Sequence, residues 1–132
     1  MGMPNILLAE DNPTNTLIVQ TVFEMVGLSI HCVENGRLAV EASATERFDL
    51  ILMDVQMPVM DGLTAIRQIR AAEASSGRLP SRIYTVTTNC SPQDMRASLE
   101  AGADGHINKP LKPELLLRAL ASIEADQLKA VA

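Results

Sequence analysis

Short apolar runs alternate along the chain with segments in which apolar residues recur every three or four positions. The short runs are typical of buried strands, and the longer period is typical of amphipathic helices. The pattern predicts five strands, each followed by a helix, at residues 5–9, 28–34, 49–54, 82–88 and 105–108.

Capping residues support this interpretation. Asn12 precedes Pro13 and Ser91 precedes Pro92; an Asn or Ser side chain can cap a helix, and proline suits the first helical turn. Residues 72–81 are expected to form a surface connection after the third helix. The apolar positions that define the first, third and last helices are Leu17, Ile18, Val22, Met25 and Val26; Leu63, Ile66 and Ile69; and Leu116, Leu120 and Ile123.

Strands that alternate with helices indicate an α/β fold, in which helices cover both faces of a parallel sheet. The strands are apolar throughout, as expected where a sheet is buried on both faces. The sequence has no internal repeat and no linker-like segment, so we expect one domain over residues 1–132 with its core at about 5–125.

Composition narrows the class of protein. The chain has 132 residues, of which 47% are apolar and 20% charged, and its net charge is -5. This acidic balance argues against a nucleic-acid-binding protein, because such proteins are basic. Cys32, Cys90, His31 and His106 could supply zinc ligands, but they lack the close spacing that zinc sites use.

Targeting signals are not evident in the sequence. No apolar run approaches the ~18 residues of a membrane-spanning helix. The residues at the start of the chain lack the basic segment of a signal peptide. We therefore expect a cytoplasmic location and no membrane contact.

Acidic residues follow two of the predicted strands. Glu10 and Asp11 come after the first strand, and Asp54 ends the third. Such sheets bind ligands beyond the carboxyl ends of their strands, and a strand order of 2-1-3-4-5 would bring these carboxylates together. Two like charges ~4 Å apart repel by about 4 kcal/mol at an effective dielectric constant near 20. A compensating cation is therefore expected, and oxygen ligands of this kind suit Mg²⁺.

A threonine and a lysine are expected at the same edge of the sheet. Thr87 lies near the end of the fourth strand, and Lys109 follows the fifth. A carboxylate can act as a nucleophile and form an aspartyl-phosphate. Mg²⁺ and Lys109 would shield the charge that develops during such a transfer. The residues therefore favour a protein in which Asp54 accepts a phosphoryl group.

Four motifs, in this order, resemble those of response-regulator receiver domains of two-component signalling: AEDN (9–12), LILMDVQMPVMDG (50–62), VTTN (86–89) and NKP (108–110). The resemblance implies a flavodoxin-like (βα)5 fold with strand order 2-1-3-4-5. It implies Mg²⁺-dependent transfer from a phosphohistidine to Asp54, which switches the surface of the fourth helix, fifth strand and fifth helix. The implied partner is a histidine kinase or a histidine phosphotransfer protein.

The resemblance also assigns roles to the residues around the metal. Asp54 is the implied phosphoacceptor and a metal ligand. Asp11 is the implied direct ligand of Mg²⁺, and Glu10 acts mainly through water. Gln56 would offer its backbone carbonyl to the metal.

Thr87 resembles the switch hydroxyl of the family and Lys109 its phosphoryl-binding lysine, whose bond to Pro110 is usually cis. Two positions depart from the family pattern, since His106 replaces the usual Tyr or Phe and Thr88 stands where a small Ala is common. We expect His106 to be a partly exposed strand residue that fills the place of the ring. Access to the site is expected to be narrower because of Thr88.

Two other classes of protein, with different functions, also contain a parallel sheet of this kind. A HAD-like phosphohydrolase usually carries a second Asp two residues after its nucleophile, where this chain has Gln56. A flavodoxin-like cofactor binder needs a phosphate loop after the first strand, where Glu10 and Asp11 would repel phosphate. We therefore expect a signalling domain rather than a turnover enzyme. AEDNPTN and LMDVQMPVMDG look especially like receivers of hybrid histidine kinases, so we expect a receiver of hybrid-kinase or phosphorelay type. It is either a stand-alone receiver or part of a longer protein.

Overall fold

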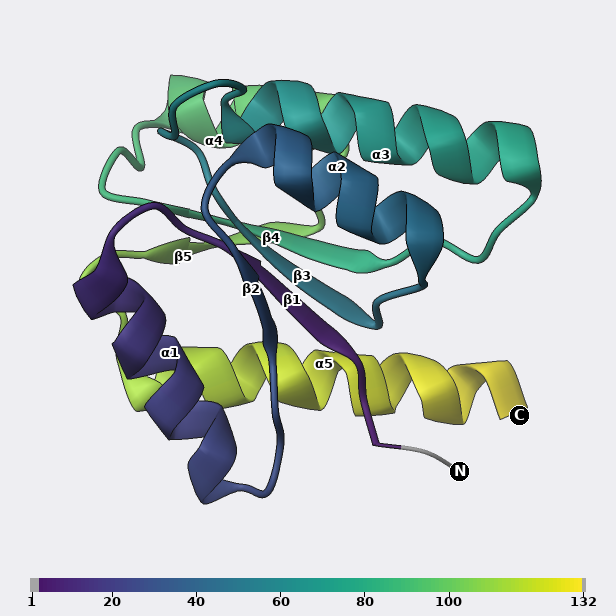
Figure 1. Cartoon of the computed structure of the whole chain (residues 1–132). Helices are drawn as coiled ribbons and strands as arrows, with labels where there is room; N and C mark the ends of the chain where they lie inside the picture. Colours follow the sequence, from purple (N-terminus) through teal and green to yellow (C-terminus); the bar gives the residue numbers. More distant parts are fainter. Residues whose placement is uncertain (1–2, 132) are drawn as a thin grey trace.

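A computed structural model describes the backbone of residues 3–131 and the side chains of residues 3–123. The strands are β1 (Ile6–Ala9), β2 (His31–Val33), β3 (Leu50–Asp54), β4 (Arg82–Thr87) and β5 (Gly105–Asn108). The helices are α1 (Pro13–Met25), α2 (Gly36–Thr45), α3 (Gly62–Ser76), α4 (Pro92–Ala101) and α5 (Pro113–Val131). All strand pairs are parallel, in the order β2-β1-β3-β4-β5, which confirms the expected fold (Figure 1).

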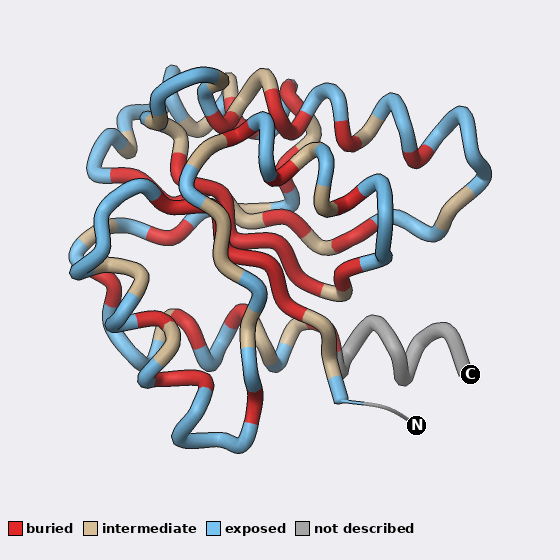
Figure 2. The backbone as a smooth tube through the Cα atoms, viewed as in Figure 1, coloured by how far each residue is buried: buried red, intermediate tan, exposed pale blue. Residues whose placement is uncertain are grey.

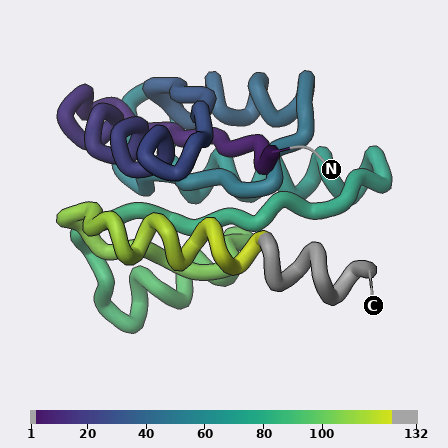
Figure 3. The backbone as a smooth tube through the Cα atoms, turned by 90° about the horizontal axis from the view of Figure 1, so that it is seen from below, coloured from purple at the N-terminus to yellow at the C-terminus, as the bar shows by residue number. Residues whose placement is uncertain are grey.

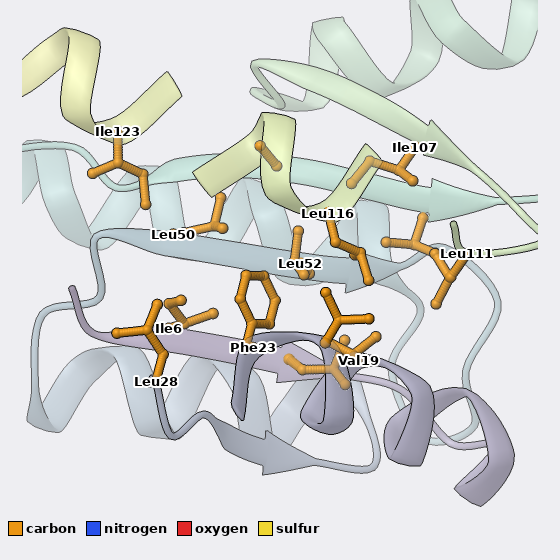
Figure 4. Close-up of a cluster of buried hydrophobic side chains, with 14 residues drawn as sticks. Ile6, Val19, Phe23, Leu28, Leu50, Leu52, Ile107, Leu111, Leu116 and Ile123 are labelled. Carbon is orange, nitrogen blue, oxygen red and sulfur yellow. The ribbon is translucent and has the colours of Figure 1, made fainter. Parts of the chain in front are cut away.

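The sheet divides the hydrophobic core into two clusters. α1 and α5 lie next to each other on one face (Figure 3), where Phe23 and Leu116 belong to the same cluster as Leu52 (Figure 4). α2, α3 and α4 cover the other face, where the cluster includes Phe48 and Ile66. β1 and β3 are buried along their whole length (Figure 2), because both faces of each strand are covered.

The pairing register places the carboxyl ends of the strands at one edge of the sheet. Ala9 of β1 pairs with Met53 of β3, and Thr87 of β4 pairs with Asn108 of β5. The residues that end these strands, or directly follow them, therefore emerge side by side. None of the described helices is long and apolar enough to cross a membrane.

Two elements differ from the sequence-based prediction by more than one residue at a boundary. β2 is shorter than the predicted strand at 28–34, and Leu28 instead packs into the core before the strand begins. α3 continues to Ser76, so the prediction of a connection from residue 72 was wrong. The helix ends where Gly77 adopts a left-handed conformation with φ of 68°, as is common after a helix C-terminus.

The apolar residues of α1 do not all face the core. Val19, Val22 and Phe23 are buried, whereas Leu17 is 62% exposed and Met25 is 80% exposed. The helix is apolar on more than one side, so helical spacing alone does not identify its inward face. An apolar surface therefore remains uncovered along α1.

Candidate functional site

The carboxyl edge of the sheet carries a hollow of about 250 Å³. Glu10 follows β1, Asp54 ends β3, Thr87 ends β4 and Lys109 follows β5, and all four line this hollow. The parallel topology thus brings together residues that are far apart in the sequence, as expected for the edge where such sheets bind ligands.

Three carboxylates converge in the hollow, as the acidic residues of the sequence predict. One oxygen from each of Glu10, Asp11 and Asp54 lies within 4.8 Å of the others. Glu10 and Asp54 are buried, while Asp11 is exposed at the rim. Like charges at this separation repel strongly, so the arrangement needs positive charge nearby.

Lys109 supplies part of that charge. Its Nζ atom lies 3.2 Å from Glu10 Oε1 and 3.3 Å from Asp54 Oδ2. Burial alone would lower the pKa of Lys109, but attraction to Asp54 and Glu10 outweighs this effect and raises the pKa above its ordinary value. Lys109 is therefore a charged group held between two buried carboxylates.

Glu10 carries the strongest sign that a cation belongs here. Burial, followed by a hydrogen bond with Asp54, raises the pKa of Glu10 to about 7. The Asn12 backbone N–H donates to Glu10 Oε2 at 3.1 Å, but the buried Oε1 accepts no hydrogen bond from the described residues and meets Lys109 only as an ion pair. A buried carboxylate oxygen whose only described partner is the Lys109 ammonium, in a group of three carboxylates, fits a divalent cation such as Mg²⁺.

Asp54 is held from two sides. Its Oδ1 atom accepts a hydrogen bond from the Gln56 backbone N–H at 3.1 Å, and its Oδ2 atom faces Lys109. Gln56 thus lies at the site and lines the hollow, while the proposed use of its carbonyl as a metal ligand stays a prediction.

Thr87 is buried at the end of β4, and its hydroxyl oxygen accepts a hydrogen bond from the Asn89 backbone N–H at 3.0 Å. The Lys109–Pro110 bond is cis, as the family resemblance implies. His106 is exposed on β5 rather than partly covered. Thr88 is exposed and lines the hollow, in the position from which it could narrow access.

Sequence reasoning missed two contributions from the first turn of α1. Asn12 was expected only as a helix cap, and its side chain does accept from Thr14 N–H at 2.8 Å. Its backbone N–H also holds Glu10, which no residue pattern could indicate. Asn15 lines the hollow as well, and the signal for it was its place in the first turn of the helix that starts beside the acids.

A zinc site receives no support from the described side chains. Among them, the only group of three or more potential ligands that converge is formed by Glu10, Asp11 and Asp54. The two cysteines and two histidines of the chain are not part of such a group.

Comparisons with known proteins agree with this geometry. Residues 6–121 match the family model of the response regulator receiver domain. The sensor protein GacS of Pseudomonas syringae is 40% identical over 117 residues, which cover 89% of this chain and 13% of that protein. The autoinducer 2 sensor kinase/phosphatase LuxQ of Vibrio cholerae is 36% identical over 115 residues, which cover 87% of this chain and 13% of that protein. The chain therefore spans only a small part of these longer relatives.

Solved structures show the same likeness. The receiver domain of a sensor histidine kinase from Pseudomonas aeruginosa, with a magnesium ion coordinated in its active site cleft, is 33% identical with a TM-score of 0.77, covering 91% of this chain and 99% of that chain. A co-crystal structure from Saccharomyces cerevisiae contains the histidine phosphotransfer protein Ypd1 and the receiver domain of Ssk1. Its matched chain is 30% identical with a TM-score of 0.82, covering 88% of this chain and 86% of that chain.

Proposed function

This chain belongs to the response regulator receiver domain family, and on that premise we propose that Asp54 is the residue through which it receives a phosphoryl group in a two-component phosphorelay. The observation that carries the proposal is the environment of Asp54. This buried carboxylate lies beside two other acids and 3.3 Å from Lys109. A nucleophile, a place for a metal and a fixed cation thus meet in one hollow.

The proposed reaction is a displacement at phosphorus. A carboxylate oxygen of Asp54 attacks the phosphoryl group of a phosphohistidine, so that an O–P bond forms and the P–N bond breaks. The imidazole nitrogen leaves with the electron pair and takes up a proton. Lys109 lies where it can pair with the phosphoryl oxygens while they carry the developing charge.

The residues present also fit the metal that the reaction needs. Glu10, Asp11 and Asp54 would hold Mg²⁺ together with the Gln56 carbonyl, Glu10 mainly through water. When bound, the metal neutralises the phosphoryl oxygens. The likeness to a receiver domain that contains magnesium supports this assignment.

Thr87 and Lys109 are the proposed switch residues. The Thr87 hydroxyl accepts a hydrogen bond from Asn89, so its own proton can be donated to a phosphoryl oxygen. To shift the ratio of the active to the inactive conformation from 1:99 to 99:1 requires about 5.5 kcal/mol. One charge-assisted hydrogen bond contributes only about 1.5–3 kcal/mol. Thr87 therefore acts together with Lys109 and the metal, and the movement of β4 and β5 changes the surface of α4, β5 and α5.

The proposed partner is a histidine kinase or a histidine phosphotransfer protein, which docks on α1. This helix begins beside the site, and Leu17 and Met25 leave an apolar surface with Glu24 as its only charged residue. An exposed apolar surface of this kind is typical of a protein interaction site. The likeness to a receiver domain solved together with a histidine phosphotransfer protein favours that occupant.

The wider context follows from the relatives. They include hybrid signal transduction histidine kinases of Dictyostelium discoideum, so we propose that residues 1–132 form a single receiver domain of hybrid-kinase or phosphorelay type. It assists its own phosphorylation and dephosphorylation and is not a turnover enzyme.

The direct test is labelling by acetyl phosphate with Mg²⁺, followed by intact-mass measurement. We expect the wild type to gain one phosphoryl group and Asp54→Asn to gain none, because an amide is not a nucleophile of this kind. Asp61→Asn is the control, since Asn can also cap α3 and Asp61 is outside the proposed chemistry. Equal labelling of Asp54→Asn and wild type would reject Asp54 as the acceptor.

A further inference from the structure

Gly36, the first residue of α2, lies against the loop that follows Asp54. Its backbone N–H donates to the carbonyl oxygen of Met60 at 3.1 Å. A Cβ atom on Gly36 would lie 2.4 Å from that oxygen and 3.1 Å from the carbonyl oxygen of Asp61. These are backbone atoms, which cannot turn away as the end of a flexible side chain can. Gly36 does not have a positive φ, so the glycine is required by space rather than by backbone conformation.

The first residues of the same loop contact the side chain of Asp54. The Gln56 N–H donates to Asp54 Oδ1 at 3.1 Å, and the Gly62 N–H donates to the Val55 carbonyl at 2.9 Å. A Cβ atom on Gly62 would lie only 2.1 Å from the Asp54 carbonyl oxygen. Residues 55–61 are therefore fixed between β3 on one side and the start of α2 on the other.

The conformation of this loop depends on such contacts. Val59 has a φ of 71°, in a region that β-branched residues rarely adopt. Val59 is also 74% exposed, so its own side chain does little to hold it there. A strained backbone of this kind persists only where the surroundings fix it. Met60 directly follows Val59, and its contact with Gly36 helps to fix the backbone at this point.

We propose that Gly36 is a positioning residue for phosphoryl transfer to Asp54. By letting α2 lie against Met60 and Asp61, it holds the loop in the position from which the Gln56 peptide meets the Asp54 carboxylate. A side chain on Gly36 displaces that peptide and with it the orientation of the nucleophile. The kinetic consequence rests on the proposed function, whereas the structural consequence for the Gln56 amide does not.

The test compares Gly36→Ala with Gly77→Ala, both at a temperature where each variant is folded. Gly77 follows the last residue of α3 and is the matched control. Its φ of 68° makes alanine unfavourable there, but no atom lies within 4 Å of the added Cβ. In Gly36→Ala we expect faster hydrogen exchange of the Gln56 amide by NMR in the metal-free protein. We also expect a roughly ten-fold lower maximal rate of labelling by acetyl phosphate, with little change in the half-saturating concentration, since small misplacements mainly affect the reacting geometry. Gly77→Ala should keep both values of the wild type.

Wild-type exchange and rate in folded Gly36→Ala, or an equal loss in both variants, would overturn the proposal. If Gly36→Ala does not fold, Asn35→Ala decides. It removes the cap that accepts from Leu38 N–H at 2.8 Å and loosens the start of α2 without adding an atom. Faster exchange of the Gln56 amide supports the proposal, and unchanged exchange overturns it. If the wild type is not labelled at all, the proposed function fails, while the exchange of the Gln56 amide still tests the role of Gly36.

Discussion

Glu10 and Asp54 are buried carboxylates, and Lys109 lies within 3.3 Å of both. One lysine cannot balance three acids that converge within 4.8 Å, so negative charge remains in the hollow. Burial first, then a hydrogen bond with Asp54 and the repulsion by its charge, raises the pKa of Glu10 to about 7. A divalent cation removes the excess without protonating any of the acids.

Asp11 is the exposed member of the three converging acids, and thermal unfolding can test whether it binds the metal. Mg²⁺ at 100 times its dissociation constant should stabilise the wild type by about 2.7 kcal/mol, which thermal unfolding detects as a rise of several degrees. Asp11→Ala should show a much smaller rise because it removes one of the proposed ligands. Without metal, Asp11→Ala should be at least as stable as the wild type, since a repelling charge is gone.

Glu41→Gln is the control for this measurement. Glu41 pairs with Arg37 on an exposed part of α2, so its loss should leave the effect of Mg²⁺ unchanged. Equal Mg²⁺ effects in Asp11→Ala and wild type would rule out Asp11 as a ligand.

The sequence pattern placed each of the three acids at the end of a parallel strand, and the strand order implied by the family resemblance predicted that they meet. It could not predict how their oxygens are satisfied. The Asn12 N–H on Glu10 and the Asn89 N–H on Thr87 are backbone groups, which any residue type would offer. Such contacts depend on the path of the chain and leave no residue pattern.

Among the elements, Arg70 of α3 connects segments at the amino ends of β4 and β5, opposite the candidate site. It donates to the Gly102 carbonyl at 2.9 Å, to the Ser81 carbonyl at 2.8 Å and to Asp104 at 3.0 Å. It also pairs at 2.7 Å with Glu73, a buried carboxylate that accepts from the Ser81 N–H as well. α3, the start of β4 and the turn between α4 and β5 are therefore tied to one guanidinium.

We predict that Arg70→Ala lowers the free energy of unfolding by about 3 kcal/mol, because it leaves Glu73 buried without its cation. Arg37→Ala removes an exposed pair with Glu41 and should cost about 0.5 kcal/mol or less. Denaturant unfolding at neutral pH measures both values. A cost for Arg70→Ala as small as that for Arg37→Ala would show that the network contributes little.

This network also explains why the end of α3 was predicted incorrectly. Residues 72–76 contain small and polar side chains, which are typical of a surface connection. Glu73 nevertheless faces inward, because Arg70 and Ser81 satisfy its charge. A buried charge with partners on distant elements cannot be recognised from local sequence.

At the scale of the whole molecule, the site and the uncovered surface of α1 lie next to each other, since α1 begins directly after Asp11 and Asn12. Under the proposed function, a protein donor would place its phosphohistidine in the hollow while resting on a neighbouring surface, whereas acetyl phosphate would need to enter only the hollow. A comparison of the transfer rates from the two donors therefore distinguishes a loss of docking from a loss of reactivity at the site.

We predict that Leu17→Glu slows transfer from a phosphorylated histidine phosphotransfer protein by at least roughly ten-fold, as expected when one apolar contact of an interface is lost. Labelling by acetyl phosphate should be unchanged. Leu79→Glu is the control, because Leu79 is 73% exposed but precedes β4 at the opposite edge of the sheet. Equal slowing with both donors in Leu17→Glu would mean that the variant damages the site, and unchanged transfer from the protein donor would contradict docking on α1.

The class of the whole fold followed from periodicity alone, because strands and helices alternate from residue 5 onward. The order of the strands did not, since several orders accommodate the same alternation, and it came from the family resemblance. The exposed surface of α1 was missed for a similar reason. Leu17 and Val22 both fit a helical repeat, and only the position of α5 and the sheet decides which of them is covered.

Lys109 follows β5, whereas all three acids have been synthesised by residue 54. A growing chain on the ribosome therefore contains all three carboxylates long before it contains the lysine that lies opposite them. Until β5 has been made and has joined β4, the acids have no lysine between them. The ion pairs of Lys109 with Glu10 and Asp54 can therefore form only after translation has passed β5.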